Sequence, residues 1–374
     1  MSFVLRSTHS QSFRTGLLQS NGTAGSNSNV CSLQTPLALV ACQRAFVPFV
    51  TADVQQSLPA SAVLAVPYAE ASFLRNAGRS WEELSRYQRP VLLTHRLFDA
   101  SEDIPFSNKG VTFQLGCGRV TIESQQFQSD VTQFRPTFFE ALYPFTGATK
   151  GRSRQSRAMK QTLAMLQENT AALGSERLFA VLQGGVDVNL REIAARDLLK
   201  QPCLGYSLAG FGSGETLDER KRVLDAVLPM LPHDKPRMIS GIDSFEQMLA
   251  CVALGVDLFV TRAAQLATEA GVALSVVLSG PDVGRDCSLD LKDAKYRTDH
   301  TPLDSASNCP TSRKFTRAYL NHLINTHELL ANTLLMSHNV YAIDAFFAAV
   351  RTEIDAGTFV DWHARFVSNC KRSD

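Results

Sequence analysis

One stretch of the chain concentrates positive charge without any acid. From Lys150 to Lys160 it carries five basic residues: Lys150, Arg152, Arg154, Arg157 and Lys160. Such a cluster suits phosphate oxygens, which position a nucleic acid without reading its sequence. The alternative is an ordinary solvated helix face, which most basic runs are. Because the net charge of the chain is only +1, contact with a nucleic acid would have to depend on local clusters of this kind.

Cysteine usage and the N-terminal composition bear on the compartment. Eight cysteines are spread over the chain with no CxxC pair and no secretory leader, which favours a reducing intracellular compartment. No acid precedes Asp53, whereas arginines and serines do, a composition typical of a mitochondrial transit peptide. The polar stretch Gly22–Asn29 is equally typical of a surface loop. We expect a cytoplasmic protein, with mitochondrial or nuclear association left open.

The overall composition is that of a soluble globular protein, with 44% hydrophobic and 20% charged residues. A chain of 374 residues can bury a substantial core. The richest apolar run, around Leu37–Val50, is interrupted by Gln43, Arg44 and Pro48 and falls short of the eighteen or so residues that a membrane span needs. We therefore expect no membrane span.

Alternating strands and helices organise the C-terminal two-thirds. Leu178–Leu182 is a short apolar run ended by glycines, typical of a strand buried on both faces, and Asn189–Lys200 follows with helical spacing. The pattern continues through these segments: Tyr206–Ala209, Leu217–Leu231, Arg237–Gly241, Ser244–Leu254 and Val256–Val260. Such repeated units indicate a parallel sheet. Short strands with glycine at their C-terminal ends favour a (β/α)8 TIM barrel over a doubly wound sheet, and those ends would form the functional face.

The last hundred residues break this rhythm. Ser279–Ser312 is polar and rich in turns and reads as an insertion, after which Thr316–Thr333 and Ser337–Val350 are predicted helices. We expect three parts: N-terminal strands and loops over residues 1–90, a barrel body over 90–278, and a helical subdomain over 279–374.

Several motifs of this chain, in their order along the sequence, are similar to those of the tRNA-guanine transglycosylases. They run from about residue 109 to 350 and comprise Lys109–Phe113, Leu182–Gly185, Leu190–Glu192, Ala209–Glu215, Lys235–Gly241, Gly255–Phe259, Thr316–Leu323 and Leu334–Asn339. The resemblance implies a TIM barrel that exchanges guanine at the tRNA wobble position for queuine or a precursor. Eukaryotic members are heterodimers of a catalytic subunit and a degenerate paralogue. Gly255–Leu274 resembles that paralogue, of the queuine tRNA-ribosyltransferase accessory subunit 2 type, more than the enzyme.

The resemblance also implies three catalytic carboxylates, which this chain lacks where they align. The Asp that attacks the ribose is replaced by Val260, which cannot capture an oxocarbenium ion. The proton-handling Asp belongs to an Asp-Ser-Gly-Gly-Phe-Gln loop, where this chain has Thr94–Asp99. The purine-reading Asp belongs within Asp130–Tyr143, where Arg135 or Pro136 stand instead. We expect no catalytic residue and therefore a non-catalytic subunit that stabilises a catalytic partner and contacts tRNA.

Two alternatives stay open. The chain could be an active transglycosylase or nucleosidase that uses relocated acids such as Asp99, Asp257 or Glu140. Asp257 is a poor stand-in, because a residue three positions before Val260 points to the other face of a strand. The other alternative is a free-standing TIM-barrel binding protein without a role on tRNA.

Part of the family's base pocket has counterparts here. Gln183, Gly210 and Phe211 fall where the resemblance implies contacts to the base through a side-chain amide and backbone groups. The competing interpretation is that the glycines persist because barrel turns need their backbone freedom.

The family's structural zinc site is degenerate. Its three Cys and one His positions hold Ser307, Cys309, Ser312 and His338. A neutral serine is a poor zinc ligand, so we expect no zinc and no other cofactor. Hydrogen bonds or packing would then replace what the metal holds together. The resemblance also places the run Lys150–Lys160 at the start of a helix on the side of the functional face.

Overall fold

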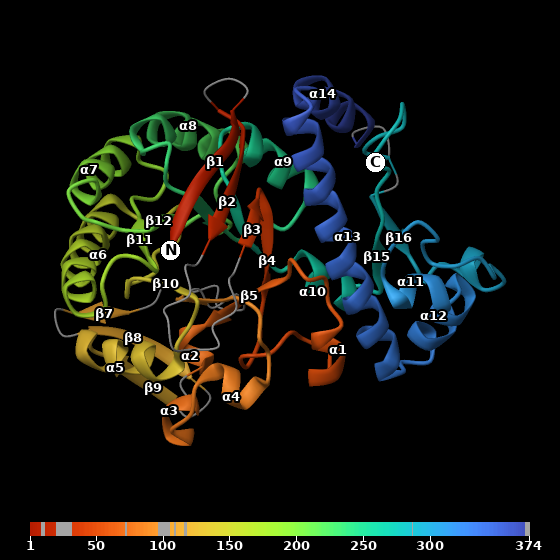
Figure 1. Ribbon diagram of the computed structural model, residues 1–374, viewed down its shortest axis with the longest axis horizontal. Helices are drawn as coiled ribbons and strands as arrows, with labels where there is room; N and C mark the ends of the chain where they lie inside the picture. Colours follow the sequence, from red (N-terminus) through yellow and green to blue (C-terminus); the bar gives the residue numbers. More distant parts are fainter. Residues whose placement is uncertain are drawn as a thin grey trace.

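Eight parallel strands close into a barrel (Figure 1). The computed structural model describes residues 1–8, 12–19, 32–71, 73–95, 105–107, 110–115, 118–285 and 287–370. In chain order the barrel strands are β4 (Leu37–Ala41), β5 (Val63–Pro67), β6 (Val91–Thr94), β10 (Phe138–Glu140), β11 (Leu178–Leu182), β12 (Gly205–Leu208), β13 (Arg237–Ser240) and β14 (Leu258–Thr261). The barrel closes where β14 pairs with β4, Leu258 opposite Leu37. The predicted TIM barrel is confirmed.

Helices form the outer layer of the barrel (Figure 1). Those that follow the later barrel strands are α6 (Arg152–Leu173), α7 (Val188–Leu198), α8 (Leu217–Val227) with the 3-10 turn η1 (Leu228–Met230), α9 (Phe245–Ala253) and α10 (Ala263–Glu269). Thr216 and Ser244 cap α8 and α9 through their hydroxyls, so these helices begin where polar caps precede an apolar face. The short helices after β4 and β5 are α1 (Ala52–Gln56), α2 (Tyr68–Ala71), α3 (Phe73–Ala77) and α4 (Trp81–Ser85).

A three-stranded antiparallel sheet lies under the N-terminal end of the barrel: β1 (Ser2–Thr8), β2 (Arg14–Gln19) and β3 (Ser32–Thr35). Arg14 joins it to the barrel with two hydrogen bonds to Asp257, Nε to Oδ1 at 2.9 Å and Nη2 to Oδ2 at 2.6 Å, and both side chains are buried. The barrel itself begins at β4, so residues 1–90 contain two barrel strands in addition to this sheet.

A second small sheet and a helix separate β6 from β10. They are β7 (Phe106–Ser107), β8 (Gly110–Leu115), β9 (Gly118–Ile122) and α5 (Ser124–Phe134). The predicted motif Lys109–Phe113 falls largely on β8, although Lys109 itself lies outside the described residues.

The C-terminal subdomain packs on the outside of the barrel. Its elements are β15 (Val272–Leu274), β16 (Ser288–Asp290), η2 (Ala294–Tyr296), α11 (Pro310–Lys314), α12 (Arg317–Asn325), α13 (Leu329–Asp355) and α14 (Phe359–Cys370). The prediction of one helix over Thr316–Thr333 was wrong. The chain breaks between α12 and α13 at His327, whose φ of +59° is left-handed and cannot continue a helix.

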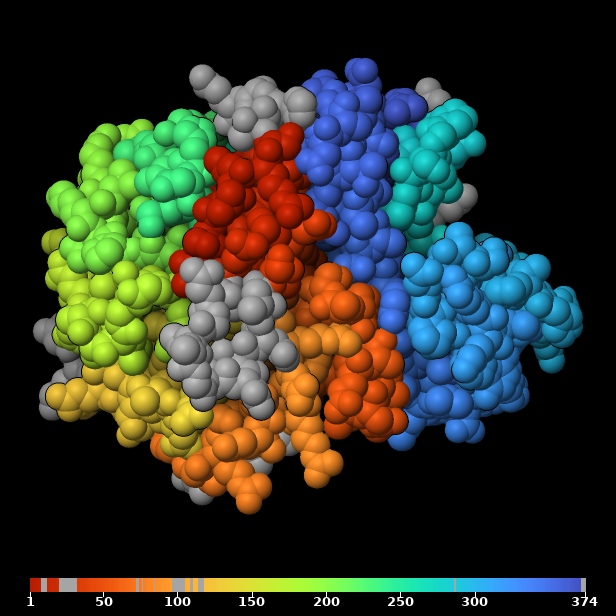
Figure 2. Space-filling view, in the orientation of Figure 1, coloured from red at the N-terminus to blue at the C-terminus, as the bar shows by residue number. Residues whose placement is uncertain are grey.

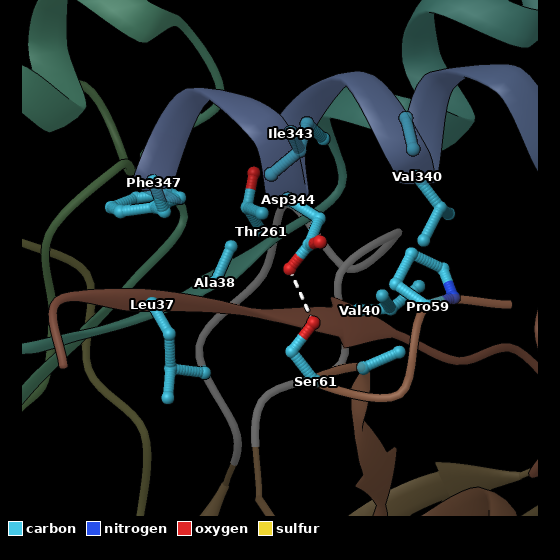
Figure 3. Close-up of a pocket in the computed structure, with 12 residues that line it drawn as sticks. Leu37, Ala38, Val40, Pro59, Ser61, Thr261, Val340, Ile343, Asp344 and Phe347 are labelled. Atoms are coloured by element: carbon cyan, nitrogen blue, oxygen red, sulfur yellow. Dashed lines mark hydrogen bonds between the residues drawn. The ribbon is translucent and has the colours of Figure 1, made fainter. Parts of the chain in front are cut away.

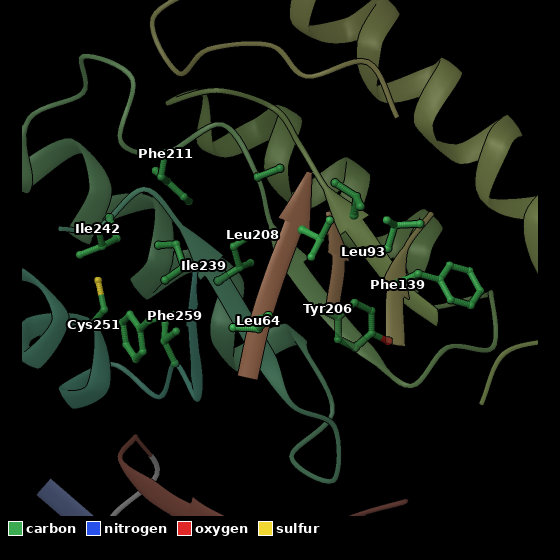
Figure 4. Packing of buried hydrophobic residues seen from close by; sticks show 14 of the residues in the cluster. Leu64, Leu93, Phe139, Tyr206, Leu208, Phe211, Ile239, Ile242, Cys251 and Phe259 are labelled. Atoms are coloured by element: carbon green, nitrogen blue, oxygen red, sulfur yellow. The ribbon is translucent and has the colours of Figure 1, made fainter. Parts of the chain in front are cut away.

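Alternation along the strands divides the core in two. Val63 and Ala65 of β5 belong to an aliphatic cluster inside the barrel, whereas Leu64 and Val66 belong to the larger cluster under the helices, as the period of two requires. Figure 4 shows part of the larger cluster, with Leu64 and Leu93 on their strands.

Among the described helices, α13 is the one long and apolar enough to cross a membrane by length and composition. In this structure it is a core helix. Of its most apolar window, 61% is buried, and Phe346 and Phe347 point from it into the larger cluster.

Candidate functional site

Val260, expected to stand at the place of the family's nucleophile, lies at the C-terminal end of β14. Phe259 faces outward, because its ring lies 5.3 Å from that of Phe347 on α13. Val260, the next residue, therefore points inward, where it is fully buried in the aliphatic cluster with Leu39 and Met238. A methyl-bearing side chain in an apolar layer offers no lone pair to an electrophilic sugar carbon.

Thr261 faces outward again and lines a small cavity between β4 and α13 (Figure 3). The cavity wall is mostly apolar, and its polar edge is a hydrogen bond from the Ser61 hydroxyl to Asp344. This cavity lies on the outside of the barrel and not at its C-terminal mouth.

A carboxylate does occupy the functional end of the barrel interior. Glu140 is the last residue of β10 and is fully buried. It accepts hydrogen bonds from the Thr94 hydroxyl at 2.7 Å, the His95 backbone N–H at 3.0 Å and the Ser207 hydroxyl at 2.5 Å. The carboxylate thus joins β10 to β6 and β12 in one polar layer, and its oxygens are engaged by protein donors.

His95 follows β6 directly and is sealed in aromatic surroundings. Its ring centroid lies 5.0 Å from Phe127 and 5.4 Å from both Tyr68 and Tyr143. Burial lowers the pKa of His95 to about 3, so the imidazole is neutral at physiological pH. Within the described residues Nδ1 has no hydrogen-bond partner, and Nε2 is 3.3 Å from the carbonyl oxygen of Glu140.

Of the acids that could replace the family's catalytic carboxylates, two lie at opposite ends of the barrel. Asp257 precedes β14 at the opposite end of the barrel, where Arg14 and the Arg237 backbone N–H occupy both its oxygens. Glu140 is at the functional end, but hydrogen-bonded as described. Asp99 lies outside the described residues.

The segment expected to hold a purine-reading acid crosses the whole barrel. Arg135 ends α5 with a left-handed φ of +52° and Pro136 follows it, both before β10 and so at the end of the barrel away from the functional face. Pro136 accepts a hydrogen bond from Arg177 at 3.1 Å. The acid of this segment that reaches the functional end is Glu140, the last residue of β10.

The three residues of the expected base pocket meet around one loop, but their polar groups are engaged. The Gln183 amide accepts from the Thr146 N–H at 3.2 Å and donates to Pro144 and to the Thr162 hydroxyl. Gly210 has a φ of +92°, and a Cβ there would lie 3.0 Å from the Thr146 carbonyl oxygen, so the backbone requires glycine. Phe211 is fully buried.

Arg191 holds these turns in place from behind. Its guanidinium is fully buried and donates to the carbonyl oxygens of Gly185, Leu182 and Ala209 at 2.7–2.9 Å. It also lies 4.4 Å above the ring of Phe211. Burial lowers the pKa of Arg191 to about 9, and the group is still charged at neutral pH. The retained motif residues therefore build the wall of the barrel end.

A family model described as queuine tRNA-ribosyltransferase matches residues 11–372. The chain belongs to the queuine tRNA-ribosyltransferase family. Two relatives named queuine tRNA-ribosyltransferase accessory subunit 2 match over nearly their full length. The one from Ixodes scapularis is 28% identical, with 88% of this chain and 94% of the relative covered. The one from Danio rerio is 28% identical, with 94% and 95% covered.

Relatives named queuine tRNA-ribosyltransferase match over a shorter stretch. The one from Synechococcus elongatus is 36% identical over 186 residues, which is 50% of this chain and 46% of that relative. The chain thus spans about half the length of such relatives. The family model also matches most of residues 1–90, which lie before the first of the family motifs.

The positions of the family's zinc ligands lie together in this queuine tRNA-ribosyltransferase family member, but as a hydrogen-bonded cluster. The Ser312 hydroxyl is 2.7 Å from His338 Nδ1, and His338 Nε2 is 2.7 Å from the carbonyl oxygen of Leu274. Cys309 Sγ lies 3.7 Å from the Ser337 hydroxyl, and the Ser307 hydroxyl accepts from the Cys309 N–H. We call Ser307, Cys309, Ser312 and His338 the serine clasp.

The serine clasp does not fit a zinc ion. It supplies one thiol and one imidazole, and both nitrogens of that imidazole already have hydrogen-bond partners. Within the described residues, no group of three or more His, Cys, Asp or Glu side chains is arranged to hold a metal ion. That the protein binds no zinc stays a prediction.

Four residues of the basic run lie in the first turns of α6, and Lys150 comes just before the helix. Because α6 follows the loop after β10, it begins at the functional end. Arg152 pairs with Asp187 at 3.1 Å, and the Arg154 guanidinium lies 5.5 Å from the ring of Phe106 on β7. Arg157 and Lys160 are exposed. No acid lies in the first turn of α6, so the arginines add to the positive end of the helix dipole.

Several site residues were not anticipated. Ser207 carries no motif and Thr94 only begins the segment Thr94–Asp99. Their contact with Glu140 arises because parallel strands bring them beside it. The motif Leu190–Glu192 includes Arg191, but it does not predict that this side chain holds the turns in place. The one signal available was its charge at an otherwise apolar helix face, which required an internal partner.

Proposed function

We propose that this chain is the non-catalytic subunit of a heterodimeric tRNA-guanine transglycosylase, in which it stabilises the catalytic subunit and contacts tRNA while queuine replaces guanine at the wobble position. The observation that carries the proposal is Val260, a buried valine at the place of the nucleophile. The near full-length match to accessory subunits from Ixodes scapularis and Danio rerio supports the same role.

Loss of the nucleophilic carboxylate alone would be enough to prevent the exchange reaction. Cleavage of a glycosidic bond passes through an oxocarbenium-like state, and a carboxylate must be in place to capture the sugar carbon. Val260 cannot do so, and the nearest carboxylate described in the barrel interior, Glu140, is held by the hydroxyls of Thr94 and Ser207. His95 beside it is buried, and its lowered pKa keeps the imidazole neutral.

The tRNA contact is proposed for the beginning of α6. Cations at a helix N-terminus are unfavourable by roughly 0.3–1 kcal/mol each, because they add to the positive end of the dipole. Arg152 and Arg154 are nevertheless placed in the first turn, with Arg157 in the next, at the functional end of the barrel. Their combined field, together with exposed Lys160, suits the phosphates of an RNA backbone.

The contact with the catalytic subunit is proposed for the start of α13. Leu329 is 82% exposed and Leu330 44%, and Phe49, 38% exposed, is tied to the same helix by a hydrogen bond from the Thr333 hydroxyl to its carbonyl oxygen. In Figure 2 the orange surface of the segment that follows β4 lies against the blue surface of α13. Exposed apolar groups gathered in this way are typical of a protein interface.

The experiment combines co-purification with guanine-exchange assays on radiolabelled tRNA. We expect the chain alone to be inactive, a catalytic paralogue to bind it, and the complex to exchange guanine. Glu140→Gln should leave the rate of the complex unchanged. Exchange by the chain alone that is abolished in Glu140→Gln would instead establish an active enzyme that uses Glu140. Failure to bind any catalytic paralogue or tRNA would favour a free-standing binding protein.

A further inference from the structure

Two cysteines that are far apart in the sequence meet at the end of the last helix. Cys287 precedes β16, and Cys370 is the last residue of α14. Their Sγ atoms are 3.9 Å apart, and neither is in a disulfide in this structure. Both side chains are partly exposed, whereas Cys42, Cys203, Cys251 and Cys309 are buried.

We propose that Cys287 and Cys370 form a reversible disulfide that fastens α14 to the segment between β15 and β16 when the glutathione pool becomes oxidised. A disulfide needs sulfur atoms about 2.05 Å apart, and two thiols already in van der Waals contact need only a small side-chain movement to reach that distance. This inference is independent of the proposed function.

The surrounding contacts hold the two cysteines together. Trp362 Nε1 donates to the Leu278 carbonyl oxygen at 3.1 Å, and Asn369 Nδ2 donates to the carbonyl oxygens of Pro281 and Val283 at 3.1 and 2.9 Å. Figure 1 shows α14 beside this part of the chain. Because three side-chain to backbone hydrogen bonds fix the helix against the segment, the thiols meet in the folded protein.

Close packing adds a second constraint. At Gly284 a Cβ would lie 2.6 Å from the backbone oxygen of Phe366, so α14 approaches the segment as closely as its backbone allows. The Cys287 thiol donates to the Gly284 carbonyl oxygen at 3.2 Å. The cysteine therefore belongs to the same tight turn that receives the helix.

The exchange balances with glutathione disulfide as the oxidant. One cysteine thiolate attacks a sulfur of glutathione disulfide, forming a mixed disulfide and releasing one glutathione thiolate. The second cysteine thiolate attacks the protein sulfur of that mixed disulfide, forming the Cys287–Cys370 bond and releasing the second glutathione. The two protons lost by the cysteines are taken up by the two released thiolates. Excess reduced glutathione reverses both steps.

The consequence falls on the C-terminal helix. Phe359, Trp362 and Phe366 of α14 pack into the larger core cluster, which includes Phe346 of α13. A bond between its last residue and Cys287 would prevent α14 from fraying away from that cluster. The bond closes a loop with a sequence separation of 83, and loops of this size restrict the unfolded chain strongly.

The test equilibrates the full chain with glutathione buffers of increasing oxidised fraction, followed by acid quenching, alkylation and peptide mass spectrometry. We expect a peptide linked through Cys287 and Cys370, reversed by excess reduced glutathione, and slower tryptic cleavage after Arg365 in the oxidised protein. Cys287→Ser and Cys370→Ser should each abolish both effects, whereas Cys251→Ala, a buried control, should keep them. Persistence of both thiols, or mixed glutathione adducts without the linked peptide at the most oxidising ratio, would overturn the proposal.

Discussion

The Ser312 hydroxyl and Nδ1 of His338 are hydrogen-bonded at 2.7 Å in the core of the serine clasp. The carbonyl oxygen of Leu274 can only accept, so Nε2 of His338 carries the proton and Nδ1 accepts from Ser312. Burial lowers the pKa of His338, which keeps the ring in this neutral form. The hydrogen bonds link α11, α13 and β15 at the place where the resemblance implies a structural zinc site.

The serine clasp predicts a metal-independent fold. Ser312→Ala removes the donor to a buried ring nitrogen, so the free energy of unfolding in urea should fall by about 1–3 kcal/mol. Ser305→Ala, an exposed serine of the same subdomain, should change it by less than about 0.5 kcal/mol. A chelator should leave the melting temperature unchanged. One zinc per chain in elemental analysis would contradict this prediction.

His95 predicts a loss of stability in acid. Its pKa is about 3 in the folded protein against 6.5 for the free group, so the unfolded chain binds more protons between these values. The contribution of His95 to the free energy of unfolding is therefore fully present above pH 6.5 and is lost as the pH decreases toward 3. At pH 4.5 the His95 contribution should have decreased by about 2–3 kcal/mol, and His95→Leu should show a correspondingly smaller loss between pH 7 and 4.5. Equal losses in both proteins, measured by urea unfolding, would exclude this role of His95.

The buried ion pair between Arg14 of the N-terminal sheet and Asp257 of the barrel predicts that the stability of the fold depends strongly on Arg14. Arg14→Ala leaves a buried carboxylate without its cation, which should cost about 3–5 kcal/mol of unfolding free energy. The comparison is Lys221→Ala, which breaks the exposed pair with Asp225 and should cost less than about 1 kcal/mol. Equal effects of the two substitutions would show that the buried pair is not special.

The start of α6 predicts salt-dependent RNA binding. Changing Arg152, Arg154 and Arg157 together to Glu should weaken the affinity of the heterodimer for tRNA, most at low salt, because counterion release scales with the number of phosphates neutralised. The control reverses Arg196 on α7, Lys200 just after α7 and Lys221 on α8, each of which has an acidic partner three or four residues away. Unchanged binding in the first variant, measured from 50 to 200 mM salt, would remove this surface from the RNA contact.

The start of α13 predicts the subunit interface. Leu329→Asp places a charge among exposed apolar groups and should weaken association with the catalytic subunit at least tenfold in sedimentation or calorimetry, because a charge left unpaired in an interface is costly. Val360→Asp, a similarly exposed apolar position on α14, should leave association unchanged. The reverse ranking of the two variants would move the interface to α14.

Periodicity predicted the barrel well because its later strands are short apolar runs that end at glycines. It failed over Thr316–Thr333, where the amphipathic pattern continues across the break but His327 turns the backbone. A three-residue turn with no proline and no glycine leaves no local signal in the sequence.

The functional end was predicted only in part. The inward direction of Val260 could be predicted, because a strand alternates strictly and its neighbour Phe259 must face the helices. That Val260 replaces a nucleophile stays a prediction. The polar layer could not be predicted, because Glu140 of β10 meets Ser207 of β12, which is 67 positions later in the sequence. Motif spacing carries no information about which side chains cross a barrel interior.

The contact between β2 and the base of β14 has a consequence for synthesis. Arg14 must wait for Asp257, which is 243 positions later, and β4 must wait for β14 before the cylinder can close. At roughly 5–20 residues per second, the ribosome releases the second partner on the order of ten seconds or more after the first. During that interval the nascent chain carries a cation without its carboxylate and an open sheet edge, which exposes it to aggregation until synthesis of β14 lets the barrel close.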